Sequence, residues 1–189
     1  RRRFIGHYIL GSFVDNKTII ALVEKGKKEY ELGAYLAAAD LFAQAAQGYA
    51  STQDELNAAE MKNNQSVALL QAGKAKEALQ ATEGTEDVFQ KAGDVKRQGI
   101  AVSNRAAALE GLKKWNEALQ EYDRAASLFE EVGEGDMHSM VRKTAANLNL
   151  KRGHIADSQM DVYDSLRLVE KPSLTQRIMK FFMRIGLIR

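Results

Sequence analysis

The sequence lacks cysteine altogether and has a single proline among its 189 residues. Without cysteine, the chain can form neither a disulfide framework nor a zinc site built from thiolates. Proline removes a backbone donor and clashes inside a helix, so its scarcity favours a chain that is helical along most of its length. No apolar run reaches the roughly 18–20 residues that cross a bilayer. These absences favour an all-α globular protein, for which the cytoplasm is the default location.

Charge is distributed unevenly along the chain. The net charge is +2, but residues 1–18 carry +3 and residues 171–189 carry +5, which leaves −6 for the residues between them. Nucleic-acid binding needs clustered lysine and arginine to contact the phosphates. The acidic middle of the chain therefore disfavours a nucleic-acid partner.

Residues 1–17 form a basic and apolar N-terminal segment. The arginines at positions 1–3 are followed by Phe4, Ile5, Tyr8, Ile9 and Leu10. The three arginines suit a solvated tail, or the positive flank that follows a membrane helix on its cytoplasmic side. If a transmembrane helix preceded Arg1, the protein would lie at the cytoplasmic face of a membrane.

An internal repeat of 40 residues runs through the middle of the chain. Two columns of the repeat hold only small residues, Ala38, Ala78, Ala118 and Ser158 in one and Gly26, Ser66, Ala106 and Ala146 in the other. Small side chains allow two helices to cross closely. Bulky residues recur near the first column at Tyr35, Trp115 and Ile155 and, seven residues later, at Phe42, Tyr122 and Val162. The columns predict helical hairpins that stack in one register.

Glycine-containing breaks between the columns predict eight helices. Gly33, Gly73 and Gly153 stand where the first helix of a hairpin ends and a left-handed residue is favoured. Lys113 replaces glycine in the third hairpin, so we expect that turn to be closed differently. Turn-like stretches such as Gly93 and Asp94 separate successive hairpins. The expected helices span residues 18–32, 35–50, 55–72, 75–92, 95–112, 116–132, 137–152 and 155–170.

With these small, glycine and aromatic columns, the chain resembles the tetratricopeptide repeat (TPR) family, in a subclass with a 40-residue period. The resemblance covers residues 18–170 and implies four repeats, at about residues 18–54, 55–94, 95–134 and 135–170. It implies an all-α fold, a right-handed superhelical α-solenoid of four helical hairpins with a C-terminal capping helix. The chain departs from the family at Thr82, Thr85, Asn149 and Ser158.

The resemblance also implies that the first helix of each hairpin lines a concave groove for a partner peptide or protein. Mapping that face gives Lys27, Tyr30, Asn63, Asn64, Val67, Ser103, Asn104, Lys143 and Asn147. Asparagine offers both a donor and an acceptor, which suits the backbone of an extended peptide. A simpler role for Asn64 and Asn104 is to cap or bridge neighbouring hairpins. The basic cluster with which one branch of the family holds acidic chaperone tails is not present in the first three repeats.

Residues 173–189 predict an amphipathic, basic C-terminal helix. Ser173 and Gln176 form a capping-box pattern after Pro172, which ends the preceding helix. The stripe of apolar residues includes Ile178, Phe181, Phe182 and Ile185, and the basic residues beside it are Arg177, Lys180 and Arg184. The stripe suits a cap on the last hairpin, and it also suits contact with a membrane surface, a partner or a second copy of the chain.

The sequence holds no recognisable catalytic, cofactor-binding or metal-binding constellation. We expect His7 at a terminus and His138 and His154 in turns, without metal-ligand spacing. Gly6, Gly11 and Ser12 imitate a phosphate loop that lacks its lysine. We therefore expect a non-enzymatic scaffold, without a cofactor, that binds a partner protein in its groove. The alternative is a membrane-associated or self-assembling structural factor that acts through its terminal segments.

Overall fold

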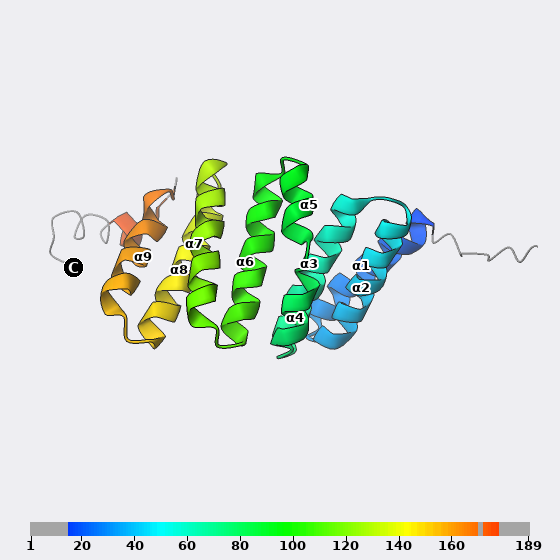
Figure 1. The fold of residues 1–189 in the computed structure, drawn as a ribbon, viewed down its shortest axis with the longest axis horizontal. Coiled ribbons are helices and arrows are strands. Elements are labelled where there is room, and N and C mark those ends of the chain that lie inside the picture. The colour runs from blue at the N-terminus through cyan, green and yellow to red at the C-terminus, as the bar shows by residue number, and fades with distance from the viewer. Residues whose placement is uncertain (1–14, 170–171, 178–189) are drawn as a thin grey trace, which may run out of the picture.

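The chain is a row of helical hairpins in a computed structural model, which describes residues 15–169 and 172–177. Within residues 15–169 the helices are α1 (Asn16–Glu31), α2 (Tyr35–Ser51), α3 (Glu55–Gln71), α4 (Ala75–Ala81), α5 (Thr85–Lys91), α6 (Val95–Gly111), α7 (Trp115–Glu131), α8 (Gly135–Lys151) and α9 (Ile155–Arg167). Figure 1 shows them following one another along the long axis. The described residues contain no strand. The predicted all-α solenoid of helical hairpins is confirmed.

Each hairpin packs its first helix against its second and then against the next hairpin. The hairpins are α1 with α2, α3 with α4 and α5, α6 with α7, and α8 with α9. Neighbouring hairpins meet mainly where α2 contacts α3, α5 contacts α6, and α7 contacts α8. In the middle of the row, α3 also contacts α6 directly. The first helices of the second and third hairpins therefore lie side by side.

Small residues allow the close helix crossings that the repeat predicts. A Cβ atom at Gly26 would lie 2.9 Å from the ring of Phe42, so α1 and α2 could not approach as they do with a larger residue there. In the second hairpin, the Ser66 hydroxyl donates to the Ala78 carbonyl oxygen at 2.9 Å. Ala38, Ala78 and Ala118 are fully buried. The predicted columns of small residues are confirmed as helix contacts.

The turn inside the third hairpin is closed in the same way as the others, contrary to our expectation for Lys113. In the first hairpin, Gly33 has a φ of 78° and its N–H donates to the Tyr30 carbonyl oxygen at 3.0 Å. Lys113 has a φ of 61°, and its N–H donates to the Glu110 carbonyl oxygen at 2.9 Å. Packing of α6 against α7 imposes this backbone path, and lysine adopts it at a conformational cost of about 1–2 kcal/mol.

The second hairpin departs from the single helix predicted at residues 75–92. Its second arm is divided between α4 and α5 at Gly84, whose φ is 74°. The Thr82 hydroxyl donates to the Leu79 carbonyl oxygen at 2.7 Å, and the Thr85 hydroxyl donates to the Thr82 carbonyl oxygen at 2.9 Å. Hydroxyls bonded to nearby carbonyls compete with the helical ladder, and glycine readily adopts the left-handed conformation. The prediction of one unbroken helix is wrong.

The buried apolar residues of the described chain form clusters of unequal size. One cluster, around Ile19 and Phe42, joins α1, α2 and α3. Another, around Val102 and Phe129, joins α6, α7 and α8. Between them, a smaller cluster consists of Ala59, Phe89 and Ala101, with Leu56 and Val88 packed against it. The smallest of these clusters therefore lies where α5, beside the break, meets α3 and α6.

Only the start of the predicted C-terminal helix is described. Ser173 N–H donates to the Gln176 side-chain oxygen at 2.7 Å, and Gln176 N–H donates to the Ser173 hydroxyl oxygen at 3.3 Å, which confirms the capping box. Residues 174–177 form one helical turn. The rest of that prediction, at residues 178–189, and residues 1–14 of the N-terminal segment lie outside the described residues. Among the described helices, none combines the length and the apolar character that crossing a membrane requires.

Candidate partner-binding surface

The residues predicted to bind a partner lie on the first helices, and we call this surface the first-helix face. Its middle is formed by Asn64 and Val67 on α3 and by Ser103 and Asn104 on α6. All four side chains are half-buried, on two helices that contact each other. The Ser103 hydroxyl donates to the Ile100 carbonyl oxygen at 2.9 Å. The four predicted residues therefore lie half-buried on two helices that contact each other.

The other predicted residues of this face lie at opposite ends of the row (Figure 1). On α1, Lys27 is exposed and pairs with Glu24 at 2.9 Å, while Tyr30 packs edge-on against Tyr35 with ring centroids 5.3 Å apart. On α8, Lys143 and Asn147 are exposed. The two ends can therefore serve one ligand only if that ligand extends along the whole row.

Asn63 does not lie on an open surface. Its side chain is 4% exposed, and its Oδ1 has no hydrogen-bond partner among the described residues. Asn64, one residue further along α3, is half-buried. Neighbouring residues of a helix point about 100° apart, so Asn63 points toward the core although Asn64 does not. The face predicted from the sequence was therefore one residue too wide at this position. The assignment of Asn63 to the groove is corrected by its burial.

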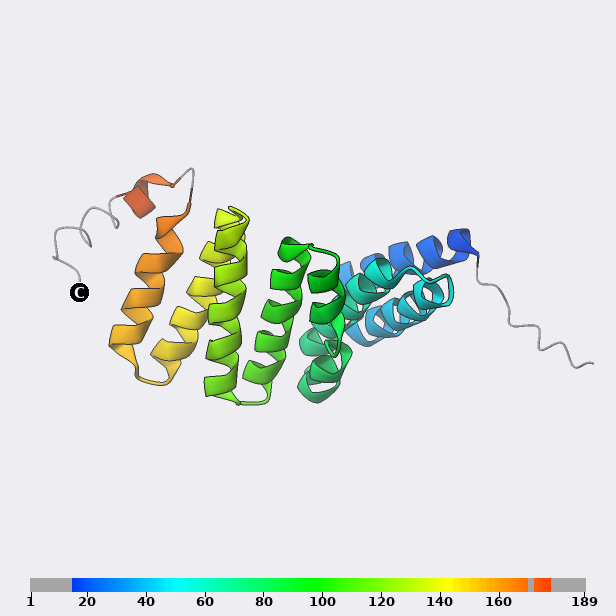
Figure 2. The same cartoon turned by 45° about the horizontal axis from the view of Figure 1, so that its top comes forward.

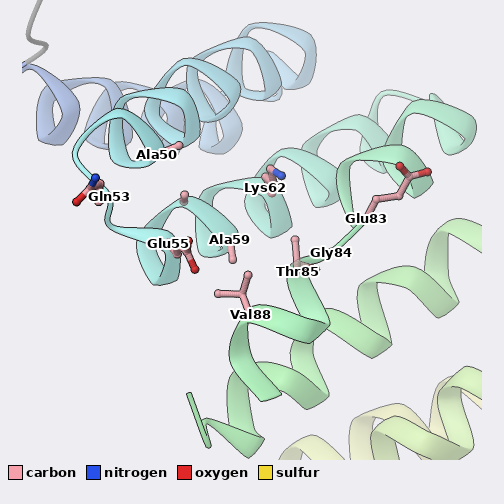
Figure 3. Close-up of a pocket in the computed structure, with 10 residues that line it drawn as sticks. Ala50, Gln53, Glu55, Ala59, Lys62, Glu83, Gly84, Thr85 and Val88 are labelled. Carbon is pink, nitrogen blue, oxygen red and sulfur yellow. The ribbon is translucent and has the colours of Figure 1, made fainter. Parts of the chain in front are cut away.

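Hollows flank the break between α4 and α5. One, of about 500 Å³, lies between α3 and the start of α5 and is shown in Figure 3. Its lining combines small or apolar residues with the polar residues Gln53, Glu55, Lys62 and Glu83. A second hollow, of about 400 Å³, also borders Gly84 and extends toward α6. Thr82 stands where the other hairpins have Phe42 and Tyr122, so the missing aromatic ring helps to explain the space around the break.

Ion pairs join the middle hairpins beside these hollows. Arg97 on α6 lies 3.3 Å from Glu60 on α3 and 2.6 Å from Asp94, and its guanidinium carbon is 5.2 Å from the centre of the Phe89 ring. Asp94 also caps α6 by accepting from the Arg97 N–H at 2.9 Å. This backbone hydrogen bond is the main reason that the pKa of Asp94 lies below its ordinary value. Arg97 therefore links α3, α5 and the start of α6.

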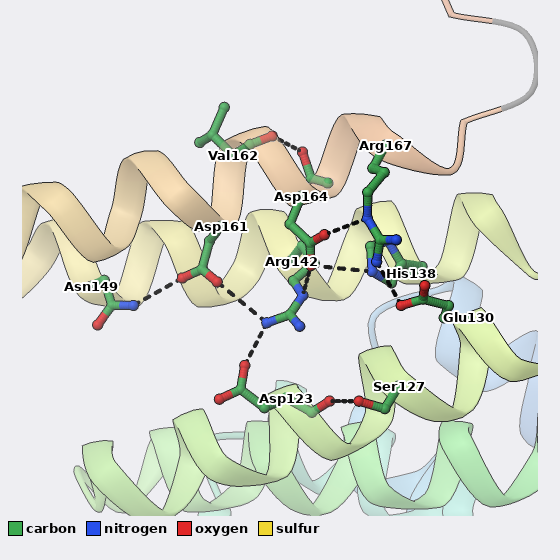
Figure 4. A network of polar contacts seen from close by, with 11 residues as sticks. Asp123, Ser127, Glu130, His138, Arg142, Asn149, Asp161, Val162, Asp164 and Arg167 are labelled. Atoms are coloured by element: carbon green, nitrogen blue, oxygen red, sulfur yellow. Dashed lines mark hydrogen bonds and ion pairs between the residues drawn. The ribbon is translucent and has the colours of Figure 1, made fainter. Parts of the chain in front are cut away.

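A polar network holds the fourth hairpin to the third (Figure 4). Arg142 on α8 pairs with Asp123 on α7 and, at 3.4 Å and 2.6 Å, with Asp161 and Asp164 on α9. Asn149 donates to Asp161 at 2.9 Å. Burial raises the pKa of Asp161, and the hydrogen bond from Asn149 opposes that shift. The departure from the family pattern at Asn149 thus has a structural role, because its amide supplies a partner for a half-buried carboxylate.

His138 lies inside α8 and is fully buried, which corrects its expected place in a turn. Its Nε2 is 3.5 Å from Asp164 Oδ2, and neither ring nitrogen has a hydrogen-bond partner among the described residues. Burial lowers the pKa of His138 more than the nearby Asp164 raises it, and Arg142 lowers it further. The ring is therefore held neutral, as a part of the packing between α8 and α9.

The family can be identified once these hairpins are compared with known proteins. A family model described as "Soluble NSF attachment protein, SNAP" matches residues 22–188. The chain belongs to the SNAP family. The match runs from within α1 to beyond α9 and so includes most of the first-helix face. A comparison with curated proteins gives no match.

Membership of the SNAP family confirms the broader prediction of a helical-repeat protein. The narrower assignment to a tetratricopeptide subclass stays a prediction. Of the residues predicted to contact a membrane or a second copy, Arg177 is exposed, while Ile178, Lys180, Phe181, Phe182, Arg184 and Ile185 lie outside the described residues. No group of three or more potential metal ligands occurs in the part of the chain that the structure describes.

Sequence reasoning missed two features of this SNAP-family chain. Thr82 and Thr85 indicate an irregular second unit, and Gly84 between them is the residue that could have located the break. The polar network had a weaker signal, the acidic residues Asp161 and Asp164 on the side of α9 that faces α8. Periodicity could not reveal their partner Arg142, because the contact joins separate helices.

Proposed function

We propose that this SNAP-family protein is a non-enzymatic interaction scaffold that binds a segment of a partner protein on its first-helix face. The family is named for soluble NSF attachment proteins, and a scaffold that attaches one protein to another fits that name. The observation that supports the proposal is the contact between α3 and α6, the two helices on which Asn64, Val67, Ser103 and Asn104 are half-buried.

The chemistry of this surface suits an extended peptide. Each of Asn64 and Asn104 offers an amide donor and a carbonyl acceptor, which are the groups that pair with a peptide backbone. Val67 adds an apolar contact one helical turn after Asn64, and half-burial limits the side-chain entropy that binding must overcome. Polar groups held on packed helices are ordered before binding, which lowers the cost of association.

The test compares two double variants of the full chain. In Asn64→Ala with Asn104→Ala, two side-chain hydrogen bonds to the partner are lost, at about 1 kcal/mol each. The dissociation constant for a partner captured with the parent chain should therefore rise about 30-fold. The matched control changes Gln44 and Gln120 to alanine, because these amides are exposed on the second helices α2 and α7.

The measurement is affinity capture from cell extract, followed by calorimetry with the purified partner. We expect the control to bind as the parent chain does and the asparagine variant to bind weakly. Recovery of the same partner with equal affinity by both double variants would refute binding at the first-helix face. A cytoplasmic location, and a membrane or self-assembly role for the terminal segments, stay predictions.

A further inference from the structure

One side of α9 is apolar where the same side of α7 is polar. On α9, Met160 is 68% exposed and Tyr163 is 46% exposed. One repeat earlier, the same two columns hold Gln120 and Asp123, both exposed on α7. Met160 and Tyr163 are three residues apart, so they lie on one side of the helix. These two residues form what we call the α9 outer face.

The described chain ends beside this helix. After α9, the helical turn at residues 174–177 lies next to the C-terminal end of α9 in both views (Figures 1 and 2). Leu174 in this turn is exposed. Twelve residues, 178–189, follow it in the sequence. At about 1.5 Å per residue, a helix of that length would extend roughly 18 Å, which is close to the length of the 13-residue α9.

The composition of residues 178–189 complements the α9 outer face. They contain apolar residues at helical spacing, among them Ile178, Phe181 and Ile185, and no acidic residue. Their positive charges are Lys180, Arg184 and Arg189. The neighbouring carboxylate on α9 is Asp157, whose side chain is 67% exposed. An apolar face with an exposed carboxylate beside it fits a short apolar segment with basic flanks.

We propose that residues 178–189 dock on the α9 outer face of the same molecule and cover Met160 and Tyr163. Residues 172–177 connect this segment to α9, which gives the segment a high effective concentration there. A separate molecule would compete for the α9 outer face only at a concentration above that value. Met160 and Tyr163 are exposed, and covering them would remove their apolar surface from water. This apolar segment thus binds the hairpin of α8 and α9 instead of a membrane or a second copy.

The absence of cysteine from the sequence allows a direct test in the full chain. Met160→Cys is combined with Ile185→Cys, and the pair is treated with a short bifunctional maleimide. The matched control combines Met140→Cys with Ile185→Cys, because Met140 is 59% exposed and lies on α8. Both methionines are exposed, so neither change should disturb the fold, which circular dichroism checks. We expect the Met160 pair to cross-link within one molecule roughly tenfold faster than the Met140 pair.

Three other outcomes would overturn the proposal. Equal intramolecular rates for the two pairs would mean that the segment does not select α9. Cross-links between molecules, increasing with protein concentration, would make a second copy the occupant. Co-sedimentation of the parent chain with vesicles that contain phosphatidylserine, lost when residues 178–189 are deleted, would place the segment on a membrane surface.

Discussion

Replacing Gly99 with alanine tests how closely α6 and α7 are packed. A Cβ atom at Gly99 would lie 2.8 Å from the ring of Phe129, which is almost fully buried in the cluster that joins α6, α7 and α8. The ring has little room to move, because protein interiors are closely packed. We therefore expect Gly99→Ala to destabilise the protein, although alanine is the better helix former.

Two opposing effects set the magnitude. Alanine in place of glycine inside a helix stabilises by about 1 kcal/mol. Overpacking a filled core costs about 1–3 kcal/mol, so the net loss should be about 1 kcal/mol. If the ring is the cause, Gly99→Ala should be neutral or mildly stabilising when Phe129 is replaced by leucine. The double-mutant cycle should then show a coupling of about 2 kcal/mol.

Urea unfolding followed by fluorescence measures each free energy, since Trp115 is the single tryptophan and packs against the same cluster. A change in midpoint at constant slope reports stability alone. Two results would refute this reasoning: Gly99→Ala stabilises the parent chain, or the effects of the two substitutions on the free energy of unfolding are additive. In either case, a clash with the Phe129 ring is not what excludes a larger residue at position 99.

Three further predictions concern the turns, a cap and the buried histidine. Gly84→Ala should cost about 1 kcal/mol in urea unfolding, because its φ of 74° disfavours a side chain, whereas Lys113→Gly should gain up to about 1 kcal/mol. Asp94→Ala should cost about 1–2 kcal/mol by the same assay, because α6 loses its N-cap, and Asp94→Asn should retain much of that stability. Burial lowers the pKa of His138 in the folded protein. As pH drops below about 6.5, the unfolded chain therefore binds a proton at His138 more readily than the folded chain does, and the melting temperature should fall. His138→Gln should flatten that dependence between pH 7.5 and 5.5, and an unchanged slope would contradict the assignment.

The fold was largely predictable because its signals are local. Gly26 and Ala78 recur at fixed spacing, and a small residue at a helix crossing serves the same purpose in every hairpin. The second hairpin was predicted less well. A helical pattern continues through Gly84 in the sequence, and only the combination of two threonine hydroxyls with a left-handed glycine ends α4 there.

The partner-binding surface was predictable in outline and not in detail. The register of α3 is sufficient to place Asn64 near the surface, but it did not distinguish Asn64 from the buried Asn63. One residue changes the direction of a side chain by about 100°, so the depth of each position depends on how neighbouring helices pack. For α3, these neighbours are α2, α4, α5 and α6.

The sequence by itself determined the helical hairpins, their 40-residue register and the capping box at Ser173 and Gln176, because these depend on residues close together in the chain. Tertiary structure decided the rest. It imposed a left-handed conformation on Lys113, buried His138 without a hydrogen-bond partner among the described residues, and joined Arg142 to acidic residues on two other helices. Burial and ion pairing arise where separate helices pack together, and the spacing of residues within one helix does not specify which residues of another helix they will contact.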